Sequence, residues 1–392
     1  YTISFDMPAL SACGGGGGGG ARGGAGGSTD VAAAIGVGRA SGLGRGGDGD
    51  APVLMLHGYG SGSALWAPNL AAIARGRRRA HDVYAIDALG CGLSDRPRFR
   101  CRSREDVEDV YCRMIEGWRA SHGFERVTLV GHSFGGYMSA VYALRHPERV
   151  ARLILVSPVG VPDSSLEAMV KQRAEDRRRQ AEAAAKAREE ALATGEALPP
   201  EAAGPPTRSW WWPLALALVR FLWWCGVTPN GVVRMLGPKG PSVVNSYARM
   251  RFKDGTVDKD AMGAYMYQIL AAAGSGEYAL NRVLKPGAFA VAPLSRRLPA
   301  LRVTSVDFLY GDVDWMDHKH AADVLPSLAV PARVHVLRHA GHYLFLDNAA
   351  DFNATLLDVL ERPPSGDAGG AARAAPAGVG GAAGGGGLEA RL

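Results

Sequence analysis

The sequence has few cysteines and no long uninterrupted apolar run. Its five cysteines are odd in number and form no CxxC pair, which argues against a disulfide framework or zinc site and favours a reducing compartment. The most apolar segment is Trp210–Val227, which Pro213 breaks and Arg220 interrupts. The remainder, Leu214–Val227, falls short of the roughly 20 apolar residues that a spanning helix needs. We therefore expect an interfacial or buried segment there, not a transmembrane helix.

The charge pattern gives little support for nucleic-acid binding. The net charge of +6 is mild for 392 residues, and the basic cluster at Arg75 and Arg77–Arg79 lacks interleaved aromatic residues or finger spacing. The second cluster, Lys171–Arg188, alternates with Glu and Asp. The basic clusters are better explained by attraction to an anionic membrane surface. We therefore expect no nucleic-acid partner.

Glycine is concentrated in two tracts, Gly14–Gly27 and Gly380–Gly387, which cannot bury enough apolar side chain to offset the entropy of ordering. The remaining length suits one α/β core of roughly 200–250 residues with additions. The predicted divisions are an N-terminal strand in 1–10, a glycine-rich disordered insertion at 11–50, core at 51–160, a cap with a charged insertion at 161–299, core at 300–362 and a disordered tail at 363–392.

Short Val/Ile/Leu-rich runs alternate with helical patterns in the predicted core, which indicates a mostly parallel sheet covered on both faces. The order breaks between Gly160 and Pro299, where a charged, then tryptophan-rich, then helical segment indicates a cap over the carboxyl ends of the strands. Within it, Glu167–Leu198 is interpreted as a solvated helix or an insertion. The predicted strands are Pro52–Leu56, Val83–Ile86, Val127–Val130, Leu153–Val156, Ser305–Leu309 and Arg333–Leu337, with helices over Ser103–Ser121 and Gly135–Arg145.

The strongest catalytic signal is the segment GHSFGG at Gly131–Gly136. An apolar strand precedes it and a helical pattern follows it, which is the context of a nucleophile elbow. The glycines fit this reading, because side chains at the flanking positions would collide with the neighbouring strand and helix. A packing turn with an idle serine is the alternative, but the context favours Ser133 as a nucleophile.

A serine nucleophile needs a base, and in this chain order an acid and then a histidine follow it. His342 follows the last predicted strand and is the expected base, whereas His339 lies at the end of that strand. Asp314 is the expected acid, because it follows the fifth strand with GxxD spacing; its carboxylate would hold the imidazole tautomer. Asp312 is interpreted as a turn residue.

The oxyanion hole of such a site needs two backbone N–H groups. We expect one from Phe134, which follows the nucleophile, and the other from Tyr59 in the segment HGYG after the first strand. His57 in that segment is interpreted as a structural loop residue. We expect no cofactor and no metal ion.

Several segments of the chain can be compared with known families as a set. They are HGYG at His57–Gly60, AIDALGCGLSDRP at Ala85–Pro97, GHSFGG at Gly131–Gly136, YGDVDWM at Tyr310–Met316, GHYLFLDN at Gly341–Asn348, and the cap stretches TPNGVVRMLGPKGPSVVNSY and SGEYALNRVLKPGAFA. Together they resemble the comparative-gene-identification-58-type α/β hydrolases, chiefly their plant and algal branch. The resemblance implies an α/β-hydrolase fold and lysophosphatidic acid acyltransferase, phospholipase or lipase activity, with acyl-CoA as co-substrate for transfer.

The resemblance also implies a HxxxxD motif linked to acyl transfer, here His342 to Asp347. Because His342 is already the expected base, the alternative is that Asp347 only caps the following helix. Some animal relatives lack the serine and activate a lipase instead. The presence of Ser133 favours catalysis in this chain.

The cap tryptophans suit a membrane interface, although packing in the cap core is the alternative. They are Trp210, Trp211, Trp212, Trp223 and Trp224. We expect an acyl lipid or lysophospholipid substrate taken from a membrane or lipid-droplet surface, in an intracellular, peripherally associated protein. Three hypotheses follow: a lipid acyl hydrolase, an acyl-CoA-dependent acyltransferase, and a noncatalytic lipid-droplet adaptor.

Overall fold

The computed structural model of the chain describes residues 51–76, 83–194, 212–252, 255 and 257–362. The expected N-terminal strand, both glycine tracts, the tail, Trp210 and Trp211 lie outside the described residues.

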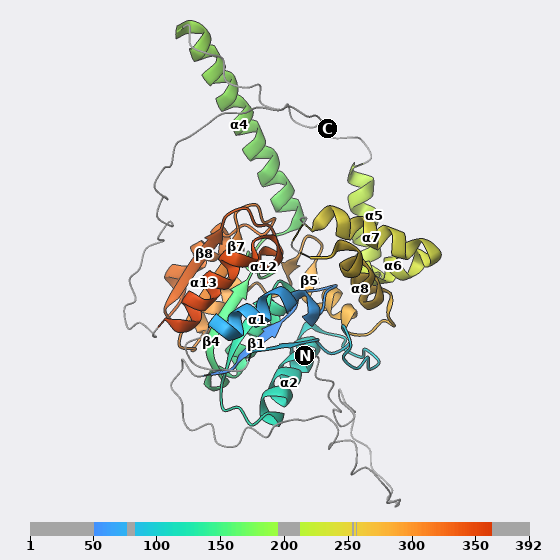
Figure 1. The fold of residues 1–392 in the computed structure, drawn as a ribbon. Coiled ribbons are helices and arrows are strands. Elements are labelled where there is room, and N and C mark those ends of the chain that lie inside the picture. Colours follow the sequence, from blue (N-terminus) through green and yellow to red (C-terminus); the bar gives the residue numbers. More distant parts are fainter. Residues whose placement is uncertain (1–50, 77–82, 195–211, 253–254, 256, 363–392) are drawn as a thin grey trace, which may run out of the picture.

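A six-stranded parallel sheet forms the centre of the described part (Figure 1). Its strand order is β2-β1-β3-β4-β7-β8, and every neighbouring pair runs parallel. All six predicted strands are present; the largest change is that β4 begins at Val150 rather than Leu153. The bounds are β1 Val53–Leu56, β2 Val83–Ile86, β3 Val127–His132, β4 Val150–Val156, β7 Val306–Gly311 and β8 Ala332–Leu337.

Alternating side chains of the strands enter two separate hydrophobic cores. In β1, Leu54 and Leu56 join the core beneath α2 and α3, whereas Val53 and Met55 join the core beneath α1 and α13. Successive residues of a strand point to opposite faces, so burial on both sides explains the near-continuous apolar runs. The covering helices are α1 Ala67–Gly76, α2 Arg104–Ser121, α3 Phe134–Arg145, α11 Lys319–Val324 and α13 Ala349–Glu361.

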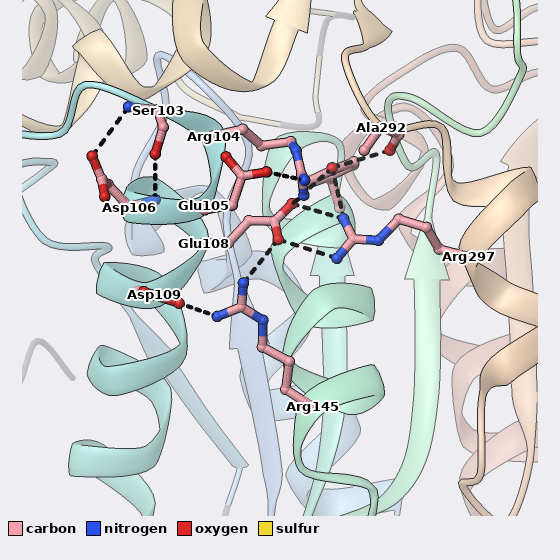
Figure 2. Close-up of polar contacts among 10 residues, drawn as sticks. Ser103, Arg104, Glu105, Asp106, Glu108, Asp109, Arg145, Ala292 and Arg297 are labelled. Carbon is pink, nitrogen blue, oxygen red and sulfur yellow. Dashed lines mark hydrogen bonds and ion pairs between the residues drawn. The ribbon is translucent and has the colours of Figure 1, made fainter.

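A buried carboxylate on α2 joins α2, α3 and the segment that returns from the cap (Figure 2). Oε1 of Glu108 accepts hydrogen bonds from Arg104 at 2.6 Å and from Arg297 at 2.7 Å. Its Oε2 accepts from Arg145 at 3.0 Å and from Arg297 at 3.1 Å. The Tyr137 hydroxyl donates to the same carboxylate at 3.1 Å. Helix α3, which begins directly after Ser133, is thereby held to both neighbours.

The chain between β4 and β7 forms the cap. Helices α5 to α8 gather at one end of the sheet, and α4 projects away from the body of the molecule (Figure 1). The predicted solvated helix is present as α4, where Arg178 and Glu182 form an exposed ion pair one turn apart. The elements are α4 Leu166–Thr194, α5 Trp212–Trp224, α6 Pro229–Met235, α7 Gly240–Arg251, α8 Lys259–Ala271, α9 Leu280–Val283, the antiparallel pair β5 Leu284–Lys285 and β6 Phe289–Ala290, and α10 Leu294–Arg297.

Candidate active site

Ser133 lies in a tight turn between β3 and α3. Its backbone has φ 53° and ψ −115°, a conformation that costs energy for any residue with a side chain. A Cβ at Gly131 would lie 2.6 Å from the carbonyl oxygen of Gly135, and a Cβ at Gly135 would lie 2.4 Å from that of His57. These positions therefore require glycine, and the expected elbow geometry is present.

The three residues expected to form a catalytic triad lie in one hydrogen-bonded row. The Nε2 atom of His342 is 3.0 Å from Oγ of Ser133, and its Nδ1 atom is 3.1 Å from Oδ1 of Asp314. The Asp314 side chain is fully buried, and that of His342 is 12% exposed. Because an ionised carboxylate only accepts, Nδ1 carries the proton and Nε2 is free to accept from the serine hydroxyl.

The two aspartates after β7 have different partners. Oδ1 of Asp314 accepts a second hydrogen bond from the Met316 N–H at 3.0 Å, which fixes the carboxylate toward His342. Asp312 lies in the turn, as expected, but it also accepts from the Ala340 N–H at 3.0 Å. The N–H groups of His339 and Ala340 lower the pKa of Asp312, with the His339 contribution the largest. Asp312 thus ties the two loops that carry Asp314 and His342.

The loop after β1 lies against Ser133. A Cβ at Gly58 would be 3.0 Å from the Cβ of Ser133, and both Tyr59 and Phe134 line the cavity above the serine. His57 has the structural role expected of it: its Nε2 accepts from the Ala88 N–H at 3.0 Å, and its Nδ1 donates to the Gly58 carbonyl at 2.7 Å. The assignment of the Tyr59 and Phe134 N–H groups to an oxyanion hole stays a proposal.

The cavity above Ser133 has a volume of about 660 Å³ and lies between core and cap. Tyr247 and Arg251 of α7 line it from the cap, while the Trp315 ring lies beside the His342 ring, tilted by 55° with centroids 5.3 Å apart. Sequence reasoning gave no role to these three residues. Trp315 belongs to the DWM stretch and Tyr247 ends the cap stretch TPNGVVRMLGPKGPSVVNSY, and these stretches were the available signals, whereas no local pattern marks Arg251.

His132 is a further site residue that sequence reasoning missed. It occupies the variable position of the GxSxG segment, and its buried Nε2 donates to the carbonyl oxygen of His342 at 2.9 Å. The sequence shows a histidine at this position of the motif. It does not show the contact with His342, because the two residues are 210 positions apart.

Asp347 does not cap the following helix, contrary to that alternative. Asn348 is the N-cap of α13, and its side chain accepts from the Asp351 N–H. The carboxylate of Asp347 instead accepts from the Gly341 N–H at 2.9 Å and pairs with Arg251. Asp347 is the last residue of the short helix α12, Leu344–Asp347, and its bond to Gly341 reaches back to the His342 loop.

Helix α5 contains three of the cap tryptophans. Trp224 is 83% exposed, whereas the neighbouring Trp223 is half-buried against the hydrophobic core. The Trp212 side chain lies outside the described residues. Within the part of the chain that the structure describes, no helix combines the length and apolar character needed to cross a membrane.

Comparisons with known proteins show the fold and the relatives of this chain. A family model of the alpha/beta hydrolase fold matches residues 51–211. A 1-acylglycerol-3-phosphate O-acyltransferase of Arabidopsis thaliana is 35% identical over 78% of this chain and 65% of its own length. A (lyso)-N-acylphosphatidylethanolamine lipase of Bos taurus is 30% identical over 79% of this chain and 79% of its own length. The chain belongs to the comparative-gene-identification-58-type family of α/β hydrolases.

Membership of this family confirms the resemblance seen in the sequence motifs and the predicted fold. The chain spans about two thirds of the length of the Arabidopsis relative. Among solved structures, a bromoperoxidase of Bacillus anthracis has a TM-score of 0.51 at 16% identity, covering 80% of this chain and 92% of its own. A meta-cleavage product hydrolase of Pseudomonas fluorescens IP01 has a TM-score of 0.50 at 17% identity, covering 79% and 89%. These two share the fold, which by itself does not name a substrate.

Proposed function

We propose that this protein is a serine lipid acyl hydrolase, of the phospholipase, lipase or esterase type, that forms an acyl-enzyme on Ser133. The observation that carries the proposal is the row from Ser133 through His342 to Asp314, with hydrogen-bond distances of 3.0 and 3.1 Å. The cavity above it is of a size that small-molecule sites have. The lipid class of the substrate is supported by the relatives, whose names specify an acylglycerol phosphate and an N-acylphosphatidylethanolamine.

The proposed reaction has two halves. Oγ of Ser133 attacks the ester carbonyl carbon while Nε2 of His342 takes the serine proton, and the charge on Asp314 stabilises the imidazolium. Backbone N–H groups of Tyr59 and Phe134 would hold the oxyanion, each worth about 2.7–4 kcal/mol in the transition state. His342 then protonates the departing alcohol oxygen, which leaves an acyl-enzyme. Water attacks this ester with His342 again as base, releasing the fatty acid and the free serine.

Acyl transfer is the second candidate, and the name of the Arabidopsis relative favours it. In that reaction an acyl-CoA thioester acylates Ser133 and releases the CoA thiol. The hydroxyl of a lysophosphatidic acid then takes the place of water. The same triad serves both reactions, so Asp347 needs no proton-transfer role in either.

We further propose peripheral association with a membrane or lipid-droplet surface through α5. Leu214, Leu218, Phe221 and Trp224 recur at intervals of three and four residues, so they share one side of the helix. These four side chains are 56–83% exposed. A contiguous exposed apolar stripe of this kind marks an interaction surface, and its tryptophan suits the depth of lipid headgroups.

A lipid panel tests the proposed function. Purified wild-type protein and Ser133→Ala are assayed on phospholipids, triacylglycerol and N-acylphosphatidylethanolamine, and separately with lysophosphatidic acid plus acyl-CoA. Fatty acid release that depends on Ser133 supports the hydrolase, and phosphatidic acid formation that depends on Ser133 supports the transferase. Folded wild-type protein that is inactive in both assays would refute catalysis and favour the noncatalytic adaptor.

A further inference from the structure

We propose that Asp347 and Arg251 form a link that sets the position of the His342 loop from the cap, and that Asp347 is a positioning residue rather than an acyl-transfer acid. This inference rests on the proposed function, because it concerns the alignment of His342 with Ser133.

The two oxygens of Asp347 hold both sides of the link. Oδ2 accepts from the N–H of Gly341, the residue immediately before His342, at 2.9 Å. Arg251 makes a bidentate pair with the same carboxylate, at 3.0 Å to Oδ1 and 3.2 Å to Oδ2. The Asp347 side chain is 3% exposed, so the pair is shielded from competing water. Bidentate charge-assisted pairs of this kind fix geometry as well as adding energy.

Arg251 also contacts the other neighbour of His342. Its guanidinium carbon lies 4.8 Å from the centroid of the Tyr343 ring, within the range of a cation–π interaction. The link therefore reaches Gly341 through Asp347 and reaches Tyr343 directly. The two residues that flank His342 are held by one side chain of the cap.

Arg251 is the last residue of α7, and α7 also faces outward. Met250 next to it is 81% exposed, and Tyr247 one turn earlier is 41% exposed while lining the cavity. A displacement of α7 would move Arg251 relative to the core. The buried carboxylate of Asp347 would then lose its cationic partner, and the His342 loop would shift relative to Ser133. A shift of about 1 Å at a reacting group can lower a rate about 100-fold.

The chain offers a matched control inside the cap. Arg234 pairs with Glu277, with Nη1 2.9 Å from Oε2, and the two side chains are 25% and 3% exposed. The Arg251 and Asp347 side chains are 23% and 3% exposed. In both pairs a partly exposed arginine contacts a buried carboxylate. Of the two, only the pair of Arg251 and Asp347 is bonded to the His342 loop.

The experiment compares Arg251→Met, Arg251→Lys and Asp347→Asn with Arg234→Met. We measure kcat and KM on a soluble short-chain ester, the rate at which a fluorophosphonate labels Ser133, thermal melting, and hydrogen exchange of the peptide around Gly341–Tyr343. Asp347→Asn keeps an oxygen for the Gly341 N–H but loses the charge. It therefore separates the hydrogen bond to Gly341 from the ion pair with Arg251. Arg251→Lys keeps the charge without the bidentate geometry.

We expect Arg251→Met and Asp347→Asn to lower kcat by about tenfold or more with KM nearly unchanged, to slow labelling, and to raise exchange at Gly341–Tyr343. Arg251→Lys should recover part of the loss, and Arg234→Met should melt at a similarly reduced temperature without these changes. Equal kcat and equal exchange in Arg251→Met and Arg234→Met would overturn the link. A wild-type protein without esterase activity would refute the proposed function alone, because the exchange comparison still tests the link.

Discussion

His132 and His342 are joined by a hydrogen bond of 2.9 Å, from the Nε2–H of the first to the backbone carbonyl of the second. His132 ends β3 and directly precedes Ser133. Strand β3 therefore positions two residues of the site. Ser133 follows it directly in the chain, and His342, the expected base, is bonded to its last residue. Burial is the main reason that the pKa of His132 lies well below its usual range, so the ring is neutral at physiological pH. A carbonyl only accepts, so the single ring proton resides on Nε2.

The first prediction follows from that bond. His132→Leu should lower kcat on a short-chain ester by about 10- to 100-fold while leaving KM nearly unchanged. The reason is that the His342 carbonyl loses the hydrogen-bond donor that holds the His342 loop in position relative to Ser133. His335→Leu is the control, since it removes a histidine of β8 that bonds Asp307 of β7 at 2.8 Å. We expect the control to retain full kcat per folded molecule. A fully active His132→Leu protein would show that the bond is dispensable.

The second prediction concerns the acid. Asp314→Asn should lower kcat by about 10⁴, because the amide no longer holds the productive tautomer of His342. Asp312→Asn, two residues earlier on the same loop, keeps an oxygen for the Ala340 N–H and should lose little activity. Steady-state kinetics and the rate of fluorophosphonate labelling at Ser133 provide the measurement. Comparable losses of kcat in the two variants would mean that activity depends on the structure of the loop and not on the Asp314 carboxylate.

The third prediction concerns the Glu108 cluster in Figure 2. Replacing Glu108 with Gln should lower the free energy of unfolding by about 3 kcal/mol, which is the lower end of the range for removing one partner of a buried ion pair. We expect the lower end because the three arginine side chains are 21–32% exposed and remain partly hydrated. Glu105→Gln is the control, because the Glu105 side chain is 62% exposed and its pair should contribute little. Chemical denaturation measures both. Equal stability of the two variants would contradict a structural role for Glu108.

Two carboxylates of α2, Glu108 and Glu116, set a direction for acid unfolding. Burial acts to raise the pKa of Glu108, but the hydrogen bonds and charges of Arg297 and Arg104 outweigh it and leave the pKa below its usual value of 4.5. A hydrogen bond from Arg119 is the main reason that the pKa of Glu116 falls to about 2. Both carboxylates therefore contribute stability that is complete above pH 4.5 and is lost as pH falls toward the folded-state values. The melting temperature of wild type should drop between about pH 4.5 and 2, and more steeply than that of Glu108→Gln.

The motifs that depend on local geometry could be predicted from the sequence. A strained serine between a strand and a helix needs glycines at fixed spacing, and the loops after consecutive parallel strands meet at one edge of the sheet, so Ser133, Asp314 and His342 were identifiable. Arg251 was not, because it lies 96 residues from Asp347 and its helix has no pattern that specifies this contact. Either Asp347 or Asn348 could have capped α13 by residue type. In the structure Asn348 is the cap, because the carboxylate of Asp347 is occupied by Arg251 and by the Gly341 N–H.

The last prediction separates the two expected roles of the cap tryptophans by comparing two adjacent residues that differ in exposure. Trp224→Ser removes an 83% exposed ring from the apolar stripe of α5, so it should weaken binding to anionic liposomes without changing the melting temperature. Trp223→Ser removes a half-buried ring that packs against the core, and its backbone carbonyl accepts from the Asn281 amide at 2.9 Å. This second variant should lower the melting temperature, because a packed aromatic side chain is lost. Liposome flotation at low and high salt, run beside thermal melts, measures both effects. Unchanged flotation of a stable Trp224→Ser protein, extended to Phe221→Ser on the same stripe, would rule out α5 as the lipid-binding surface.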